Sequence, residues 1–306
     1  MVSRGKGRSA PQVYEGSFYD LCQRFMESEK FKGFAEGTQA LWRRELAFAC
    51  APNCLGHLSL TEIRPALVQG YLDGWSDKPG KQQNALRAIQ AVEKWARVRD
   101  LLPHQITLGV ETGRPQGGHI PWTEGQIRHA ERWARPDMSR VITLAGQTGQ
   151  RISDLVRMCW PDIESFRGQE GINVTQHKTG RQVWVPIFEE LAAAMATWER
   201  QPGPFLRRLD GGLWESKNLT LAWRHEKDRN KHLAEHKSLG LVLHGLRGHC
   251  CVRLSRAGLS DHQISDIVGM SIPMVGRYTR LSAQKENALA AVISLSRYKS
   301  LKLKDA

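Results

Sequence analysis

The sequence predicts two domains, an all-α N-terminal domain followed by a mixed α+β, mainly helical domain that carries a small β-hairpin sheet. Three observations support this prediction. The chain has 306 residues, which is enough to build two cores. A helical pattern of apolar residues continues through residues 17–102. Residues 103–121 are then rich in Pro, Gly and Thr and have no periodicity, which is typical of a linker between domains.

The first domain is predicted over residues 15–102, behind a basic tail at residues 1–14. Apolar residues recur in this domain at helical spacing and indicate four helices. Thr61 is expected to cap one of them, and residues 82–98 form a long amphipathic stretch that indicates another. Because the basic tail lacks an apolar segment, we expect no secretory signal and a protein of the cytoplasm.

The second domain is predicted over residues 122–306, with Thr123 as the N-cap of its first helix. Residues 171–175 and 182–187 have strand character, and the polar turn between them indicates a β-hairpin. The periodicity after the hairpin is helical. Helices are expected at residues 189–198, 217–227, 244–257, 261–268 and 282–296.

The composition favours a polyanionic partner. Lys and Arg number 44 against 31 Asp and Glu, and this net charge of +13 is typical of proteins that bind nucleic acid. No apolar run approaches the length of about 20 residues that crosses a bilayer, so we expect no membrane partner. Two basic domains joined by a linker predict a clamp around duplex DNA. The basic residues expected to follow the phosphates are Arg43, Arg44, Arg87, Lys94, Arg97, Arg99, Arg207, Arg208, Arg224, Lys227, Arg229 and Lys231.

The six cysteines are scattered without the paired spacing of a disulfide framework, so we expect reduced thiols. Neither group of soft ligands in the sequence has a second ligand pair at the spacing of a zinc site. The sequence therefore predicts no metal site and no cofactor. The two groups are Cys50, Cys54 and His57, and His249, Cys250 and Cys251.

Four polar patches follow one another in the second domain. They are TGQRISDL with Arg151, HKTGR with Lys178, HGLRGHC with His244 and Arg247, and GRYTR with Tyr278. His244 and Arg247 lie three residues apart at a predicted helix start, so their side chains project from one face. In type and order the four patches resemble the tyrosine recombinase, or phage integrase, family.

This resemblance spans residues 122–278 and implies that the first domain corresponds to the family's core-binding domain and the second to its catalytic domain. It implies a metal-independent enzyme that breaks and rejoins double-stranded DNA at specific recombination sites. The enzyme would self-associate to a tetramer on DNA in a bacterial cell, associated with the nucleoid, with DNA-bending or directionality factors as further partners. Because the basic tail is too short for an arm-binding domain, we expect a two-domain member that integrates or excises a phage or other mobile element.

Tyr278 is the nucleophile that the resemblance implies. A phenol with an ordinary pKa of about 10 leaves more readily than an alkyl alcohol, so a DNA 5′-hydroxyl can reverse a 3′-phosphotyrosyl bond. Negative charge builds on the non-bridging oxygens when the phosphorus becomes five-coordinate. Arg151 and Arg247 would neutralise it with aimed donors, as magnesium does in many nucleases.

Three further residues take their roles from the resemblance. His244 would accept or share a proton near the nucleophile, and Lys178, at the tip of the hairpin, would protonate the departing 5′-oxygen as the general acid. Asp154 follows Arg151 by one helical turn and would orient a neighbouring side chain.

One position departs from the family pattern. Met270 stands where members carry His or Trp, and a thioether cannot donate a strong hydrogen bond to phosphate. Either Met270 packs around the nucleophile, which we favour, or Ser271 or His249 supplies the lost donor. The step from Met270 to Tyr278 is also one residue shorter than the family pattern predicts. Tyr298 is an alternative nucleophile, but it lacks the surrounding motif.

Other functions use similar residues. A non-catalytic DNA-binding regulator would not need the complete set of five residues. A type IB topoisomerase would share the chemistry but would not exchange DNA partners. A chromosome-dimer-resolving recombinase would share both the chemistry and the exchange of DNA partners. The segment LSAQKENALAAVISLSRY after Tyr278 has an apolar helical face, as expected of a recombinase helix that docks on a neighbouring protomer.

Overall fold

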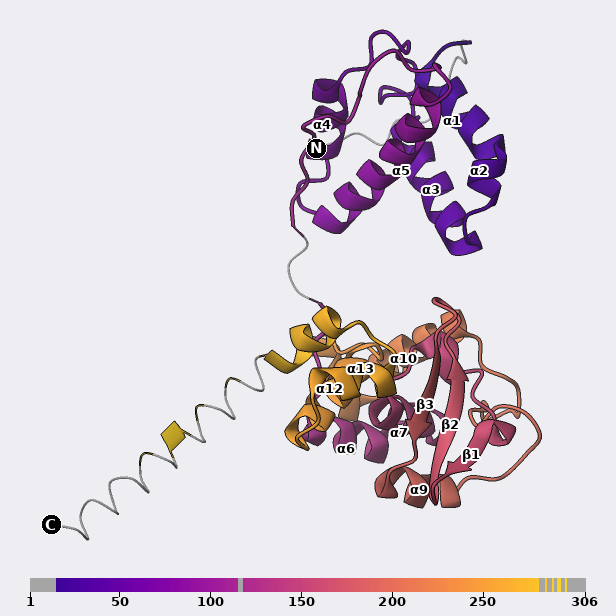
Figure 1. Ribbon diagram of the computed structural model, residues 1–306, viewed down its shortest axis with the longest axis vertical. Helices are drawn as coiled ribbons and strands as arrows, with labels where there is room; N and C mark the ends of the chain where they lie inside the picture. The colour runs from indigo at the N-terminus through magenta and orange to yellow at the C-terminus, as the bar shows by residue number, and fades with distance from the viewer. Residues whose placement is uncertain are drawn as a thin grey trace, which may run out of the picture. The chain divides into compact units, whose positions relative to one another are not determined.

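The structure is a computed structural model, and the chain divides into two compact units between Gln116 and Gly117 (Figure 1). Each unit is mainly helical, and a three-stranded antiparallel sheet lies in the second. No helix in the described part of the chain has the length and apolar character needed to cross a membrane. The structure describes residues 15–114 and 118–280, and singly residues 284, 288, 291, 292 and 295.

The described part of the first unit has five helices rather than the four predicted. Ser28 creates the additional one, because its hydroxyl donates to the Phe25 carbonyl at 2.6 Å and accepts from the Phe31 N–H at 3.3 Å. It therefore ends one helix and caps the next. The five are α1 (Phe18–Glu27), α2 (Glu29–Lys32), α3 (Glu36–Ala49), α4 (Pro65–Asp73) and α5 (Pro79–Arg97).

Thr61 is not a helix cap, so that prediction was wrong. Helix α4 begins at Pro65, with Arg64 at the N-cap position. Proline is favoured at the first helical position because its fixed φ suits the helix and its missing N–H is not needed there. Ile63 therefore lies before the helix, where its fully buried side chain joins the core of the first unit.

The first part of the predicted linker packs against the first unit. Ile106 is fully buried in the core of this unit, and Leu102 beside it is 4% exposed. The Ile106 N–H and the Thr107 hydroxyl both donate to the Glu93 carboxylate of α5. These contacts hold the chain on the first unit beyond residue 102, well into the Pro- and Gly-rich stretch.

The second unit confirms the predicted hairpin, and a third strand precedes it. Strand β1 has a mostly exposed pattern, so apolar alternation gave no signal for it. Thr123 caps α6 in a capping box with Gln126. The elements are α6 (Glu124–Trp133), α7 (Pro136–Thr148), α8 (Ile152–Leu155), η1 (Trp160–Asp162), β1 (Ile163–Phe166), β2 (Gln169–Thr175), β3 (Gln182–Pro186), α9 (Glu189–Ala196), α10 (Ser216–Arg229), η2 (Lys231–Leu233), α11 (Ala234–Ser238), α12 (Gly245–Arg256) and α13 (Asp261–Val268).

The sheet and three helices position the site. Strand β2 lies between β1 and β3, α13 packs against β3, and α12 packs against α7 and α13 (Figure 1). Residues 272–280 form a further helical stretch, which carries Tyr278. Most of the expected helix at 282–296 lies outside the described residues, although each residue described singly there is helical.

Candidate active site

The Thr-Gly turn after α7 places two of the predicted residues. Gly149 ends this helix with a φ of +62°, in the left-handed region that favours glycine. A Cβ at Gly149 would lie 3.0 Å from the Cys250 side chain and 3.1 Å from that of Val268. The Gly149 carbonyl accepts a hydrogen bond from Arg247 Nη1 at 2.6 Å, so the turn that precedes Arg151 also holds Arg247.

Arg151 is held by a buried glutamine that sequence reasoning missed. Arg151 Nη1 donates to Gln176 Oε1 at 2.8 Å and lies 3.8 Å from Asp154 Oδ2. The Gln176 side chain is fully buried, and its Nε2 donates to Gln150 Oε1 at 2.8 Å and to the Val268 carbonyl at 2.9 Å. Gln176 thereby connects the Arg151 turn, the hairpin and the end of α13.

The sequence contained a signal for Gln176. Ile172 and Val174 are the buried alternate positions of β2, and Gln176 continues their period of two. An amide at a buried position needs hydrogen-bond partners. A polar residue at this point, two positions before Lys178, is therefore a candidate for holding other polar groups.

Asp154 ties the Arg151 turn to the base of the hairpin loop. Its side chain is fully buried, and Oδ1 accepts a hydrogen bond from the backbone N–H of His177 at 2.9 Å. The neighbouring residue in the loop is Lys178, whose side chain is exposed. A buried carboxylate with this partner supports the orienting role that we predicted for Asp154.

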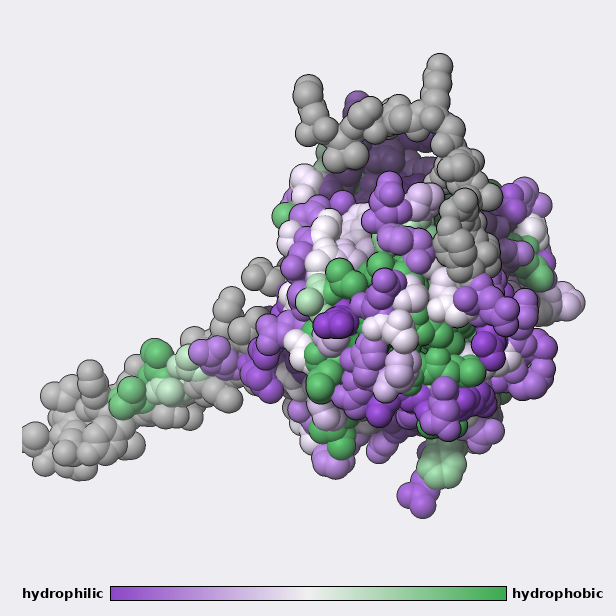
Figure 2. Space-filling model, turned by 90° about the horizontal axis from the view of Figure 1, so that it is seen from above, coloured by the Kyte–Doolittle hydropathy of each residue, from purple (hydrophilic) through white to green (hydrophobic). Residues whose placement is uncertain are grey.

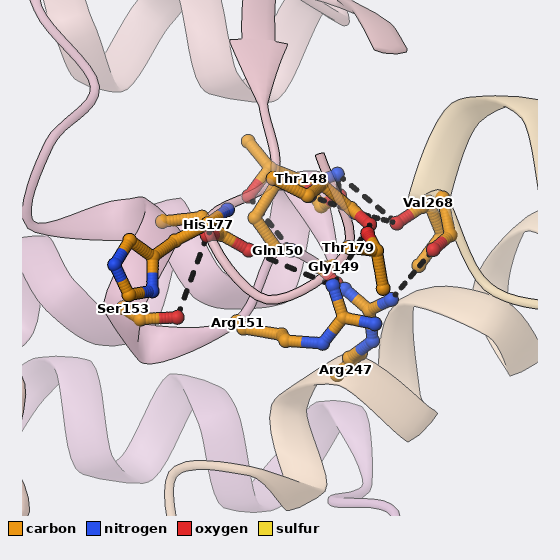
Figure 3. Close-up of polar contacts among 12 residues, drawn as sticks. Thr148, Gly149, Gln150, Arg151, Ser153, His177, Thr179, Arg247 and Val268 are labelled. Atoms are coloured by element: carbon orange, nitrogen blue, oxygen red, sulfur yellow. Dashed lines mark hydrogen bonds and ion pairs between the residues drawn. The ribbon is translucent and has the colours of Figure 1, made fainter. Parts of the chain in front are cut away.

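The two arginines form a positively charged cluster in which Arg247 is buried and the Arg151 side chain is 22% exposed. Arg247 is 3% exposed, and Figure 3 shows its guanidinium close to that of Arg151. Burial lowers the pKa of Arg247 to about 10, and the positive charge of Arg151 contributes to this shift. Two cations that share a desolvated site repel each other, so an anion bound between them would be stabilised.

His244 precedes α12 and lies among the cationic residues. Its pKa is lowered to about 4, mainly by burial and then, in decreasing order, by the neighbouring His119, Arg247, Arg151 and Lys178. The imidazole is therefore neutral near pH 7 and can accept a proton. These interactions bring together four predicted residues from three separate motifs.

Tyr278 lies on the same face of α12 as His244. The Tyr278 ring packs against Gly248, where a Cβ would lie 2.7 Å from Cδ1 and 2.8 Å from Cε1 of the ring. Gly248 follows His244 by four residues, which is about one helical turn. Burial raises the pKa of Tyr278, while the charge of Arg247 lowers it. Gly248 is a second residue that sequence reasoning missed.

Met270 packs in the apolar cluster beside Tyr278. Its side chain is 6% exposed and lies in a cluster with Val268 and Val275, against which Tyr278 is also packed. Its backbone carbonyl accepts a hydrogen bond from the Ser265 hydroxyl at 2.6 Å. These contacts favour the packing role for Met270.

The two proposed substitutes for the missing donor differ in their surroundings. His249 is buried, and its Nδ1 lies 2.8 Å from the Trp122 carbonyl while its Nε2 lies 3.3 Å from Glu124 Oε1. Both ring nitrogens of His249 thus face partners outside the arginine cluster. Ser271 is exposed. Tyr298, the alternative nucleophile, lies outside the described residues.

Metal ligands do not gather in the part of the chain that the structure describes. No group of three or more His, Cys, Asp or Glu side chains there could hold a metal ion. Cys250 and Cys251 are fully buried, and Cys54 is partly exposed. The six thiols are free.

The basic residues expected to follow phosphates differ in their availability. The six in the first unit are exposed. The face of the molecule drawn in Figure 2 carries hydrophilic and hydrophobic residues side by side. In the second unit, Lys227 Nζ donates to the Leu241 carbonyl at 2.6 Å, and Arg207 donates to the carbonyls of Pro202 and Gly211. Lys227 and Arg207 therefore make hydrogen bonds within their own unit, as do Arg44 to Glu45, Arg99 to the Trp95 carbonyl and Arg208 to Asp210.

The site's residues come from the region that matches a known family. The sequence model of the phage integrase family matches residues 134–285. Through this domain the chain belongs to the phage integrase family, the tyrosine recombinases. No curated protein matches the sequence.

Solved structures of a phage integrase and of a transposon integrase share the fold of both units. A lambda integrase dimer bound to a COC′ core site matches with a TM-score of 0.71 and 16% identity, over 86% of this chain and 77% of that one. A lambda integrase tetramer bound to a Holliday junction matches with a TM-score of 0.70 and 16% identity, over 86% and 77%. The Tn1549 transposon integrase in complex with circular intermediate DNA matches with a TM-score of 0.60 and 16% identity, over 84% and 94%.

Proposed function

We propose that this phage integrase family member is a site-specific DNA recombinase that cleaves and rejoins DNA through a covalent 3′-phosphotyrosyl intermediate on Tyr278. The observation that carries the proposal is the pair of Arg151, which is half-buried, and Arg247, which is buried, held by separate hydrogen bonds beside the α12 face on which Tyr278 packs. A DNA phosphate is an anion of the right charge for this pair. The phenol oxygen of Tyr278 is the nucleophile that attacks this phosphate.

The arginine pair acts most strongly on the transition state. Attack by the Tyr278 oxygen makes the phosphorus five-coordinate and places more negative charge on its non-bridging oxygens. Gln176 and the Gly149 carbonyl hold the two guanidinium groups before the phosphate arrives, so little reorganisation is needed during the reaction. Arginine also stays charged at this depth, because even the lowered pKa of Arg247, about 10, lies above neutral pH.

Two other groups move protons. Neutral His244 takes or shares the phenol proton, since burial and the surrounding cations keep its pKa low. Lys178, exposed at the hairpin, protonates the 5′-oxygen as the P–O bond breaks and the phosphotyrosyl bond forms. Attack by a 5′-hydroxyl of the partner strand then reverses these steps and releases the Tyr278 phenol.

The proposal includes the partners and the biological role. The arginine pair supplies the charge stabilisation, so cleavage is metal-independent. The protein binds its recombination site as double-stranded DNA, assembles as a tetramer there and integrates or excises a phage or other mobile element. The likeness to integrases solved on a core site, on a Holliday junction and on a circular intermediate supports this assembly and role.

The test is covalent trapping on a nicked suicide substrate taken from the element border that flanks the gene. Wild-type protein should form an adduct on the DNA 3′-phosphate in the presence of a chelator, and peptide sequencing should place it at Tyr278. Tyr278→Phe keeps the ring but removes the attacking oxygen, so it should bind the same duplex and form no adduct. An adduct on Tyr298, one that persists in Tyr278→Phe, or cleavage that requires magnesium would contradict the proposal.

A further inference from the structure

Residues 118–122, which open the second unit, lie directly on the start of α12. A Cβ at Gly245 would lie 2.2 Å from the Ile120 carbonyl oxygen, and a Cβ at Gly248 would lie 3.1 Å from Pro121 Cγ. Both glycines are therefore needed for the close approach of this segment. Because Tyr278 also packs on Gly248, the segment and the proposed nucleophile share one point on α12.

Trp122 anchors the segment at its C-terminal end. The indole is 2% exposed, and its N–H donates to the Val242 carbonyl at 2.9 Å, just before α12. The Trp122 carbonyl accepts from His249 Nδ1 at 2.8 Å, within α12. These hydrogen bonds attach the segment to the chain on both sides of His244.

His119 uses this anchored segment to reach His244. The centroids of the two imidazole rings are 4.6 Å apart, and the rings meet edge to face at 65°. This is a favoured geometry for aromatic pairs. His119 is otherwise exposed, so its ring covers His244 on the solvent side.

We propose that His119 is a positioning residue for strand cleavage, which holds the His244 ring in the orientation that serves Tyr278. This inference rests on the proposed function, because the proposed function gives His244 its role as the proton acceptor. Within the described residues, His119 acts through His244: its ring contact is with that imidazole, and Pro121 of the same segment contacts Gly248. A fixed ring holds the in-plane nitrogen that accepts the phenol proton in one direction.

The groups that face His244 come from four elements. They are His119 on the segment, Arg247 on α12, Arg151 at the start of α8 and Lys178 on the hairpin, and each lowers the pKa of His244. Removing the His119 ring exposes His244 to water and takes away one of these charges. Both changes raise the pKa of His244 from about 4 toward its ordinary value. The acidic limb of the cleavage profile then moves to higher pH, because His244 becomes protonated there.

The experiment compares adduct formation and the His244 titration in wild-type, His119→Ala and His119→Phe proteins. His119→Ala should slow adduct formation about fivefold at neutral pH, since an edge-to-face contact is lost. It should also move the acidic limb upward and raise the NMR-measured pKa of His244. His119→Phe keeps an aromatic edge, so its rate should return to within about twofold of wild type. The matched control is His225→Ala, an exposed histidine of α10, which should change neither quantity.

Three outcomes overturn the inference. The first is an identical His244 titration in wild-type and His119→Ala proteins, which is measured without any cleavage. The second is cleavage by His119→Ala and His225→Ala with identical rates and pH profiles. The third is an equal loss of rate in His119→Ala at every pH without rescue by phenylalanine, which indicates a structural defect. Absence of an adduct in wild-type protein counts against the proposed function instead. The NMR titration of His244 then still tests the contact between His119 and His244, because it does not depend on cleavage.

Discussion

Replacing Gly248 with alanine tests whether the nucleophile is seated on α12. The new methyl group would lie 2.7 Å from Tyr278 Cδ1, 2.8 Å from Cε1 and 3.1 Å from Pro121 Cγ. Carbon atoms in ordinary contact are about 3.5 to 4.0 Å apart. The Tyr278 ring must therefore move by roughly 1 Å away from the helix.

The expected loss follows from that displacement. A misplacement of about 1 Å can cost about a hundredfold in rate, because the attacking atom is no longer aligned with the phosphorus. Alanine is a better helix former than glycine by up to about 1 kcal/mol, so the helix itself is not weakened by the change. Gly248→Ala should thus form the covalent adduct about a hundredfold more slowly while it binds DNA as wild type does.

Single-turnover adduct formation on the suicide substrate measures this rate, and thermal unfolding checks the fold. Gly146→Ala is the matched control, because Gly146 is also a helical glycine of the second unit, in α7. Its new Cβ would lie 3.6 Å from Ile127 Cδ1, an ordinary contact, so the rate should change little. Gly248→Ala protein that cleaves as fast as Gly146→Ala would refute the seating of Tyr278 on Gly248.

Two further substitutions test other parts of the site. Gln176→Ala removes the acceptor for Arg151 and the donor to Val268, so it should lower the free energy of unfolding by about 1 to 3 kcal/mol in denaturant titration and slow cleavage. An unchanged unfolding midpoint would contradict the buried network. Lys178→Ala should slow cleavage of ordinary DNA but not of a substrate with sulfur at the bridging 5′ position, which needs little protonation to leave. If sulfur gives no rescue, Lys178 is not the general acid.

Local signals in the sequence were enough to predict much of the second unit. The Thr123 N-cap and the hairpin depend on neighbouring residues, and both occur as predicted. Strand β1 and the start of α4 were missed or misplaced. In β1 the alternation is absent, and at α4 the preference of proline for the first helical turn outweighed the capping ability of Thr61.

The chain alone determined which chemical groups the site contains. The ordered motifs around Arg151, Lys178, His244, Arg247 and Tyr278 specify two permanent cations, two proton carriers and a phenol, because side-chain chemistry is a property of each residue. The helix start beside His244 and the turn beside Lys178 were also local and therefore readable, whereas the helical stretch at residues 272–280, which carries Tyr278, was not predicted.

Only the tertiary structure decided how these groups are held. Gln176, Gly248 and His119 lie in none of the positions that the motif pattern marks, yet they contact Arg151, Tyr278 and His244 across long sequence separations. Such contacts depend on how the hairpin, α12 and the segment at residues 118–122 pack together. The burial that moves the pKa of His244 to about 4 arises from the same packing, since desolvation depends on every neighbour that excludes water.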